Sequence, residues 1–416
     1  VDRSTLRTSA TTPTQAFPSL DPATATDPHL LDGVDVVLQT SGSSTGTPHL
    51  VGLSVEALIA SATATHRALS GPGRWILALP AHHVAGAQVL FRAALAGTSP
   101  QIVDTTRGFD PLRLPAAIAG ATQDPDVPGY LSLVPTQLRA CLEAPSEVGV
   151  ALARLAAVLV GGSGTDPALL ERARERGIPV HTTYGMTETC GGCVYDGRPL
   201  PGVAVRTVDV EGRPRLAVSG PVLMSGYLDG PAPFIDEGGA RWLLTGDVGR
   251  VTPSGMVEVL GRSDDVIVSG GLSIAPGPVR RAVLGTPGVR DAWVLGLPDE
   301  KWGSVVAAAV VPEAGVLDAT PQEDTTEDTT EVAGAGQPEE TDAHTDGVGD
   351  SLSRAELELL ATHVRDHVGD VLGRAEAPRV VVALDTLPLL SSGKVDPHTL
   401  RTQVERRIGT GAAWRR

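Results

Sequence analysis

Short apolar runs rich in β-branched residues alternate with longer amphipathic stretches between about residues 34 and 180. The runs predict buried strands at Val34–Leu38, Trp75–Leu79, Tyr130–Val134, Ala156–Val160 and Pro179–Thr182. The stretches between them predict helices at Ser54–Leu69, Val84–Ala96, Pro135–Leu142 and Asp166–Arg176, with Ser54 and Asp166 as N-caps and Pro167 in the first turn. Strands alternating with helices are typical of a sheet covered by helices, so we expect an α/β fold here.

The pattern changes after Gly202. As far as Gly261 the apolar segments are shorter and Gly or Pro recurs every several residues, as around the strand candidates Arg215–Val218 and Met256–Leu260, which predicts a strand-rich subdomain. Further on, the pattern predicts strands at Asp265–Val268, Asp291–Leu297, Val305–Val311 and Arg379–Leu384, and helices at Gly277–Leu284, Ser353–Leu372 and Pro397–Arg407. We therefore expect a flexible segment at 1–33, a large N-terminal domain at 34–262 and a small α+β C-terminal domain at 263–416.

One acidic segment dominates the charge of the chain. The net charge is −16, but residues 313–350 contain twelve acids and no Lys or Arg, so the rest of the chain carries only −4. This segment cannot bury enough apolar surface to offset the entropy of ordering, and we expect a disordered insertion there. The near-neutral remainder offers no electrostatic footprint for nucleic acid or an anionic membrane, so small molecules are the expected partners.

Composition limits the cellular setting. At 416 residues the chain is long enough for two or three compact units, and it contains no uninterrupted apolar run of about 18 residues, which argues against a membrane span. The first 35 residues lack the charged start and apolar core of a secretory signal. Three cysteines are too few for a disulfide framework. We expect a soluble cytoplasmic protein, and its oligomeric state stays open, with a homodimer among the options.

A Ser/Gly-rich loop follows the first predicted strand directly, in the order Thr40, Ser41, Gly42, Ser43, Ser44, Thr45, Gly46, Thr47, Pro48 and His49. Glycines let backbone N–H groups approach oxygens closely and the hydroxyls add donors, so the loop suits a polyphosphate. It lacks the terminal Gly-Lys-Ser/Thr of a Walker loop. A linker is the other interpretation of such a composition.

Four further segments carry candidate chemistry. In Thr183–Thr189, Thr187 could hold a phosphate oxygen and Glu188 a Mg²⁺ ion, although a lone Glu is more often a surface charge. In Leu243–Gly249, Asp247 in a tight turn could accept hydrogen bonds from a ribose diol, or it belongs to an ordinary turn. The remaining two segments are Gly261–Asp265 and Ser392–Lys394. Lys394 stands out because the chain has only one other lysine, Lys301.

Together and in this order, the five segments resemble the adenylate-forming superfamily of acyl-CoA synthetases, adenylation domains and luciferases. The resemblance covers Asp35 to about Glu405. It implies a large N-terminal domain, a hinge, and a small mobile C-terminal domain that swings between two half-reactions, with ATP, Mg²⁺ and coenzyme A as cofactors and a small carboxylic acid as substrate.

The resemblance also implies roles for residues at matching positions. The loop from Thr40 to His49 resembles the cradle of the β- and γ-phosphates, Thr187 a phosphate contact and Glu188 the Mg²⁺ ligand. Six residues resemble the adenine-binding wall, with Tyr184 stacking on the base; they are Gly161, Gly162, Ser163, Tyr184, Gly185 and Met186. Asp247 and Arg262 resemble ribose contacts, and Asp264 the hinge. Lys394 resembles the lysine that bridges the attacking carboxylate and the α-phosphate, and Gly270 and Gly271 would line the path of the pantetheine arm.

Within the superfamily, Leu79–Gly86 and Tyr184–Gly197 are most similar to the o-succinylbenzoate–CoA ligases of menaquinone biosynthesis, in their short actinobacterial form. This implies that His83, Cys190, Gly191 and Gly192 line the acyl site. A structural role for His83, and a redox or zinc pair at Cys190 and Cys193, are the other interpretations.

Some features depart from that pattern or leave alternatives open. The phosphate loop is one residue longer than usual, His49 stands where a lysine is usual, and the Pro276–Arg280 helix start lacks its usual acidic residue. Two rival functions are an adenylation enzyme for another acid or a carrier protein, and a non-catalytic nucleotide- or acyl-binding relative. The identity of the acid is open, and Arg92 and His181 are candidates for binding a far carboxylate.

Overall fold

The structure is a computed structural model that describes residues 32–40, 48–313, 352–390 and 392–416. Contacts divide these residues into two compact units. The first contains the chain up to Val266 and the segment Pro388–Pro397, and the second contains Ile267–Leu387 and His398–Arg416. Almost all of the predicted flexible segment and of the acidic insertion lies outside the described residues. No described helix is long and apolar enough to cross a membrane.

A seven-stranded sheet forms the centre of the first unit. Its order is β4 (Gln101–Ile102), β3 (Arg74–Leu77), β5 (Gly129–Leu133), β6 (Ala157–Val160), β7 (Val180–Met186), β8 (Gly191–Tyr195) and β9 (Arg198–Pro199). The strands from β4 to β7 are parallel, whereas β8 and β9 are antiparallel to their neighbours. β7 continues four residues beyond the predicted end at Thr182, because its second half pairs with β8.

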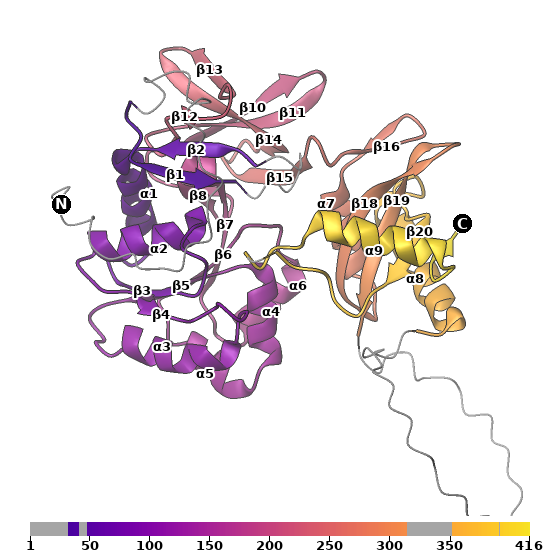
Figure 1. Ribbon diagram of the computed structural model, residues 1–416, viewed down its shortest axis with the longest axis horizontal. Coiled ribbons are helices and arrows are strands. Elements are labelled where there is room, and N and C mark those ends of the chain that lie inside the picture. The colour runs from indigo at the N-terminus through magenta and orange to yellow at the C-terminus, as the bar shows by residue number, and fades with distance from the viewer. Residues whose placement is uncertain (1–31, 41–47, 314–351, 391) are drawn as a thin grey trace, which may run out of the picture. The chain divides into compact units, whose positions relative to one another are not determined.

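Helices cover both faces of this sheet, as the pattern predicted (Figure 1). Helices α3 (Leu114–Ala121), α4 (Pro135–Glu143), α5 (Ser146–Leu152) and α6 (Pro167–Glu175) share a core with Ile76 and Leu131. The short 3₁₀ helix η2 (Pro111–Arg113) precedes α3 and contributes no buried residue. Helices α1 (Val55–Ala68) and α2 (Val84–Leu95) contribute to a separate core with Trp75 and Tyr130. Adjacent strand residues thus alternate between two cores. The predicted N-cap Ser54 accepts a hydrogen bond from the Ala57 amide at 3.1 Å.

Two smaller antiparallel sheets complete the first unit. One is β1 (Val36–Gln39), β2 (Leu50–Leu53) and β12 (Gly226–Tyr227); the other is β10 (Ala204–Val210), β11 (Arg213–Ser219), β13 (Phe234–Glu237), β14 (Ala240–Val251) and β15 (Val257–Arg262). The expectation that the first apolar run joins the helix-covered sheet was wrong. β1 instead pairs antiparallel with β2, the next strand in sequence, and joining a parallel sheet would have required a longer crossover connection.

The second unit is a small α+β domain. Its sheet contains β16 (Ile267–Ser269), β17 (Leu272–Ile274), β18 (Val289–Asp299), β19 (Gly303–Pro312), β20 (Val380–Ala383) and β21 (Trp414–Arg415). Its helices are α7 (Pro276–Leu284), α8 (Arg354–Leu372) and α9 (Pro397–Gly409). Val283 of α7 and Val364 of α8 pack on Val310 of the sheet. The predicted fold class, a large α/β part with strand-rich sheets followed by a small α+β part, is confirmed.

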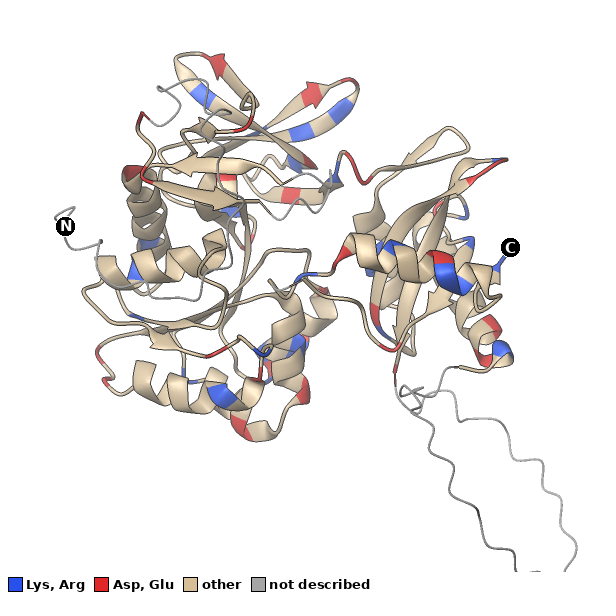
Figure 2. Cartoon of the chain, viewed as in Figure 1, with Lys and Arg blue, Asp and Glu red and all other residues tan. Residues whose placement is uncertain are grey.

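Charged residues of both signs are interspersed over the drawn part of each unit (Figure 2). Long stretches of the main sheet and its helices carry neither sign, which agrees with the apolar cores on its two faces. Charge therefore gives no guide to a binding surface, and the candidate site has to be found from specific side-chain contacts.

Candidate active site

The segment that carries Lys394 is a tight hairpin within the first unit. Leu389 forms a bridge with Val395, and the Leu390 amide donates to the Lys394 carbonyl at 2.8 Å. Thr136, in the first turn of α4, donates its hydroxyl to the Gly393 carbonyl at 2.6 Å. The hairpin is thus tied to the amino end of α4, next to the carboxyl end of β5, at an edge where α/β sheets commonly place ligands.

Lys394 reaches Gly162, which follows the end of β6. A Cβ atom added at Gly162 would lie 2.8 Å from Lys394 Cε, and Gly162 has a φ of +85°. Burial lowers the pKa of the Lys394 ammonium, and the Glu188 carboxylate acts in the opposite direction. Three residues predicted on separate segments, Gly162, Glu188 and Lys394, are therefore close enough to interact.

His83 belongs to the same region. It is the N-cap residue of α2, and its ring centroid lies 4.4 Å from that of His82. Burial, then His82, then Lys394 lower the pKa of His83 to about 4. The imidazole is consequently neutral near pH 7 and offers one donor and one acceptor.

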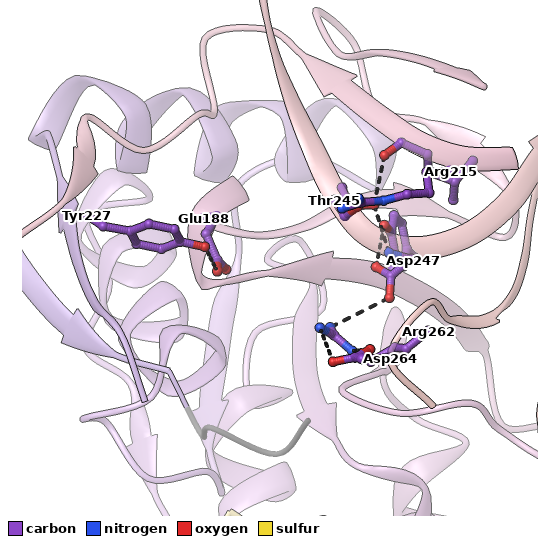
Figure 3. Close-up of polar contacts among 9 residues, drawn as sticks. Glu188, Arg215, Tyr227, Thr245, Asp247, Arg262 and Asp264 are labelled. Atoms are coloured by element: carbon purple, nitrogen blue, oxygen red, sulfur yellow. Dashed lines mark hydrogen bonds and ion pairs between the residues drawn. The ribbon is translucent and has the colours of Figure 1, made fainter. Parts of the chain in front are cut away.

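Glu188 lies in η3 (Thr187–Thr189), directly after β7. Its backbone carbonyl accepts from the Met224 amide at 2.9 Å, and its carboxylate Oε1 accepts from the Tyr227 hydroxyl at 2.7 Å (Figure 3). Burial and the Glu188 charge both raise the pKa of Tyr227, which keeps the phenol protonated as a donor. The carboxylate therefore has a fixed orientation.

Asp247 lies in β14, so the prediction that it sits in a tight turn was wrong. The residue pairs in register with Arg262 of β15, because the two strands form one antiparallel ladder. Asp247 Oδ2 accepts from the Tyr184 hydroxyl at 2.7 Å, and Arg262 Nη1 lies 3.8 Å from Oδ1. Arg262 also donates to Asp264 from Nε at 3.0 Å and from Nη2 at 3.3 Å (Figure 3).

Burial raises the pKa of Asp247, while the Tyr184 hydrogen bond and the Arg262 charge oppose that shift. A second set of contacts fixes the backbone: the Asp247 amide donates to Thr245 Oγ1 at 3.1 Å, and Arg215 Nε donates to the Thr245 carbonyl at 2.9 Å (Figure 3). A buried, positioned carboxylate of this kind can accept hydrogen bonds from a diol.

The glycines around the predicted acyl site allow very close backbone packing. A Cβ at Gly185 would lie 2.1 Å from the Gly191 carbonyl, and a Cβ at Gly191 would lie 3.3 Å from Gln88 Cγ of α2. Gly192 faces Thr183 and Tyr195 with similarly little room. Cys190 and Cys193 are buried free thiols with pKa values raised to about 12 by burial. The described residues hold no cluster of three or more His, Cys, Asp or Glu that could bind a metal.

Only the two ends of the predicted phosphate loop belong to the described residues. The Thr40 amide donates to the His49 carbonyl at 2.9 Å, and the His49 amide donates to Thr40 Oγ1 at 2.8 Å, so the base of the loop is closed. Ser41, Gly42, Ser43, Ser44, Thr45 and Gly46 lie outside the described residues. Sequence reasoning missed Tyr227 and Thr136. The scarcity of tyrosine, four in the whole chain, was a usable signal for Tyr227.

Gly270 and Gly271 belong to the second unit, in the turn between β16 and β17. Their φ angles are +57° and +83°, and a Cβ at Gly270 would lie 2.6 Å from the Trp302 ring. The Gly270 amide donates to the Trp302 carbonyl at 2.9 Å. This turn therefore requires glycine at Gly270 for both backbone and packing reasons.

Comparison with known proteins decides the family. Residues 3–228, more than half of the chain, match the model described as AMP-binding enzyme, and residues 281–340 match the AMP-binding enzyme C-terminal domain. The chain belongs to the AMP-binding enzyme family. Among its relatives, a protein of Mycobacterium tuberculosis (strain ATCC 25618 / H37Rv) named as a probable 2-succinylbenzoate–CoA ligase is 38% identical over 369 residues, which cover 88% of this chain and 83% of that protein.

Solved structures of this family agree with the fold. The o-succinylbenzoate CoA synthetase of Bacillus subtilis, in complex with the acyl-adenylate intermediate OSB-AMP, matches with a TM-score of 0.63 and 26% identity over 89% of this chain and 68% of that chain. The same enzyme in complex with ATP and magnesium ion matches with a TM-score of 0.62 and 26% identity, over 89% of this chain and 69% of that one.

Proposed function

We propose that this chain is an AMP-forming 2-succinylbenzoate–CoA ligase. In the first half-reaction the acid carboxylate attacks the α-phosphate of ATP and pyrophosphate leaves; in the second, the thiol of coenzyme A attacks the acyl carbon and AMP leaves. The names of the mycobacterial relative and of the Bacillus enzyme solved with OSB-AMP support this assignment. The proposed partners are small molecules: the acid, ATP and coenzyme A.

The observation that carries the proposal is the placement of Lys394 beside Gly162 and within the field of Glu188. Attack of a carboxylate on a phosphate brings two anions together, and a positioned cation stabilises the charge that develops. Lys394 is the one lysine of the first unit's sequence, and its hairpin is tied to α4 through Thr136. We assign Lys394 the role of holding the carboxylate against the α-phosphate.

The residues around Glu188 fit a Mg²⁺ ion. This ion prefers oxygen ligands and is usually bound by one or two carboxylates together with substrate phosphates. Glu188 provides one oriented carboxylate, and the described residues provide no larger metal cluster. Glu188 would hold the ion, which supplies further neutralisation of the phosphate charge when it is bound, and Thr187 would contact a phosphate.

The nucleotide contacts follow from the Asp247 region. Asp247, positioned by Tyr184 and facing Arg262, would accept hydrogen bonds from the ribose diol. Gly161, Gly162, Ser163, Gly185 and Met186 would surround the base together with the Tyr184 ring, and the loop from Thr40 to Gly46 would hold the outer phosphates. Asp264 is proposed as the hinge that lets the second unit move, bringing Gly270 and Gly271 to the pantetheine arm.

The far carboxylate of the acid needs a cation, and the contacts of the two candidates, His181 and Arg92, differ. The Asp196 carboxylate already accepts a hydrogen bond from His181 Nδ1 at 2.7 Å. Arg92 is buried in α2; it lies 4.8 Å above the Trp75 ring and donates to the Tyr195 hydroxyl at 3.3 Å. Its Nε has no hydrogen-bond partner among the described residues. No carboxylate of the described residues forms an ion pair with this buried cation, and an anionic ligand would supply one, so we propose Arg92 for this role.

A pyrophosphate-release assay with o-succinylbenzoate, ATP and Mg²⁺ tests the proposal. We expect release with the wild-type protein, and formation of the thioester when coenzyme A is added. Lys394→Ala should lose pyrophosphate release but still form thioester from preformed acyl-adenylate. Lys301→Ala, which removes the other lysine, should retain pyrophosphate release.

Each rival function has its own outcome in this assay. No release with any of a panel of aryl and alkyl carboxylates would leave only the non-catalytic relative. Release without thioester formation would favour an enzyme that loads a carrier protein. Equal loss of both half-reactions in Lys394→Ala would remove the two-conformation mechanism.

A further inference from the structure

Four side chains form a continuous chain of contacts from the phosphate loop to Glu188. The Asp229 carboxylate lies 3.3 Å from His49 Nδ1. The His49 ring is stacked on the Tyr227 ring, with a centroid distance of 4.6 Å and an interplanar angle of 21°. The Tyr227 hydroxyl donates to Glu188 Oε1 at 2.7 Å. The chain therefore connects the closing residue of the loop with the carboxylate that was assigned to the metal.

The backbone fixes both ends of this chain. β12, which contains Tyr227, pairs with β2, and Tyr227 lies opposite Val51 in that ladder. Asp229 Oδ2 also accepts from the Leu50 amide at 3.2 Å, so the carboxylate that holds His49 is itself held by the start of β2. His49 is joined to Thr40 by backbone and hydroxyl hydrogen bonds. Strand pairing fixes the backbone of Tyr227, and the contacts with Thr40 and Leu50 restrain His49 and Asp229.

The hydroxyl of Tyr227 has one effect on Glu188 that packing alone would not produce. A carboxylate has two oxygens and about four lone-pair directions. The hydrogen bond occupies one of these on Oε1 and leaves the other direction of Oε1 and both directions of Oε2 for a metal ion. Partners of this kind orient metal-bound carboxylates, and their removal typically costs about 10–100-fold in metal affinity or activity.

The His49–Asp229 pair has a different contribution. Both side chains are partly exposed, 41% for His49 and 30% for Asp229, and partly exposed ion pairs contribute little to stability. What the pair does provide is orientation: a hydrogen bond at Nδ1 fixes the plane of the imidazole, and that plane stacks on the phenol. We therefore attribute to His49 an effect on the angle of the Tyr227 ring.

Resting on the proposed function, we propose that Tyr227 is the positioning residue for the metal-binding carboxylate of Glu188 and that His49, held by Asp229, sets the position of Tyr227. His49 stands where a lysine is usual in this family, and in this chain it acts on the metal side of the site through Tyr227 instead of contacting phosphate. Tyr227→Phe keeps the stacked ring and removes only the hydroxyl, which makes it the decisive substitution.

The test measures ATP binding by calorimetry in EDTA and again in excess Mg²⁺, so the readout does not depend on turnover. The dissociation constant of ATP in EDTA divided by that in excess Mg²⁺ reports the contribution of Mg²⁺ to ATP binding. We expect Tyr227→Phe to reduce this ratio about 10–100-fold while leaving ATP binding in EDTA unchanged. Tyr130→Phe removes another partly buried hydroxyl of the first unit, which donates to the Gly71 carbonyl at 2.9 Å, and should leave both values unchanged.

A double-mutant cycle tests the part of the proposal that concerns His49. His49→Ala should reduce the Mg²⁺ contribution in the wild-type background and should have no further effect in Tyr227→Phe, because it acts through the hydroxyl. Additive losses would overturn this dependence. A loss of ATP affinity in EDTA on His49→Ala would show a direct phosphate contact and would also overturn it.

The inference and the proposed function fail in different ways. Wild-type protein that releases no pyrophosphate would refute the proposed function, whereas the calorimetric test of the inference would still apply if that protein binds ATP in a Mg²⁺-dependent manner. Wild-type protein that releases pyrophosphate and binds ATP in a Mg²⁺-dependent manner, beside a Tyr227→Phe variant with the same Mg²⁺ contribution, would overturn the inference alone. An equal loss with and without Mg²⁺ in Tyr227→Phe would also overturn it, since a general structural role would produce that result.

Discussion

Gly162→Ala offers a direct test of where Lys394 lies. The added methyl would lie 2.8 Å from Lys394 Cε, whereas carbon atoms in good contact are about 3.5–4.0 Å apart. The flexible Lys394 side chain shifts more easily than the backbone at residue 162, so we expect the end of the lysine to move by about 1 Å. A misplacement of about 1 Å in a catalytic group can reduce the rate about 100-fold, and we expect a loss of that size in pyrophosphate release.

The same substitution has a separate effect on stability. Gly162 has a φ of +85°, and a side chain in left-handed backbone costs roughly 1–2 kcal/mol. For a unit of this size, 1 kcal/mol corresponds to about 2–4 °C in Tm, so the first unit should unfold about 2–8 °C lower. Thermal unfolding by fluorescence and pyrophosphate release by a coupled assay measure the two effects independently.

Gly164→Ala is the matched control. It lies two residues further on, and a Cβ there would meet no atom of the described residues within 4 Å beyond its own neighbours in the chain. We expect wild-type activity and nearly wild-type Tm for this variant. If Gly162→Ala loses stability as calculated but releases pyrophosphate at the wild-type rate, Lys394 does not occupy the position described here during adenylation, and the reasoning is refuted.

Two other predictions concern buried polar residues. Arg92→Met should raise the KM for o-succinylbenzoate at least about 30-fold, as expected for the loss of a buried charge pair, and should leave the KM of aryl monocarboxylates unchanged. His181→Gln should change neither KM. Equal increases in KM for both kinds of acid would make Arg92 a packing residue only. His66 accepts from Trp75 Nε1 at 3.4 Å, and burial, then Arg92, lower its folded pKa to about 4. Because the unfolded chain takes up this proton near pH 6.5, stability should be full above pH 6.5 and fall as the pH is lowered towards 4. In chemical denaturation of the first unit, His66→Gln should reduce the slope of the unfolding free energy against pH by up to about 1.4 kcal/mol per pH unit. An unchanged slope would contradict the assignment.

Local sequence patterns were sufficient for much of the fold. Ser54 and Asp166 mark the starts of α1 and α6 because their side chains accept from backbone amides two or three residues later, an interaction that depends only on neighbours in the chain. Four strands of the parallel sheet, β3, β5, β6 and β7, were predicted within a few residues for a similar reason, since residues buried on both faces form continuous apolar runs. The two-residue strand β4 was not predicted.

Pairing between strands was harder to predict. Whether the run before the phosphate loop joins the main sheet or a hairpin depends on β2, which has only four residues and was not predicted. Asp247 was expected in a turn because Gly precedes and follows it nearby, but twelve residues of β14 pair with three other strands around it. Such pairings connect positions far apart in the sequence, and no local pattern contains them.

The same difference between local patterns and distant contacts applies to the candidate site. Gly162, Glu188, Asp247, Arg262 and Lys394 could be predicted because each lies in a motif that the resemblance made recognisable. The contacts that position them come from outside those motifs: Tyr227 reaches Glu188 from β12, and Thr136 holds the Lys394 hairpin from α4. Positioning contacts depend on three-dimensional proximity, so they became visible only in the structure.

The hairpin of Lys394 has a consequence for how the lysine could be withdrawn. Its shape depends on its own hydrogen bonds, from Leu390 to Lys394 and from Asp396 to Pro388, each 2.8 Å long, whereas its attachment to α4 includes the hydrogen bond from Thr136. One such bond is worth only about 1 kcal/mol net. Withdrawing the lysine therefore requires breaking this hydrogen bond and exposing the buried lysine, whereas the hydrogen bonds within the segment need not break. The hydrogen bonds that shape the segment around the reactive amine are thus different from the contacts that hold it against α4.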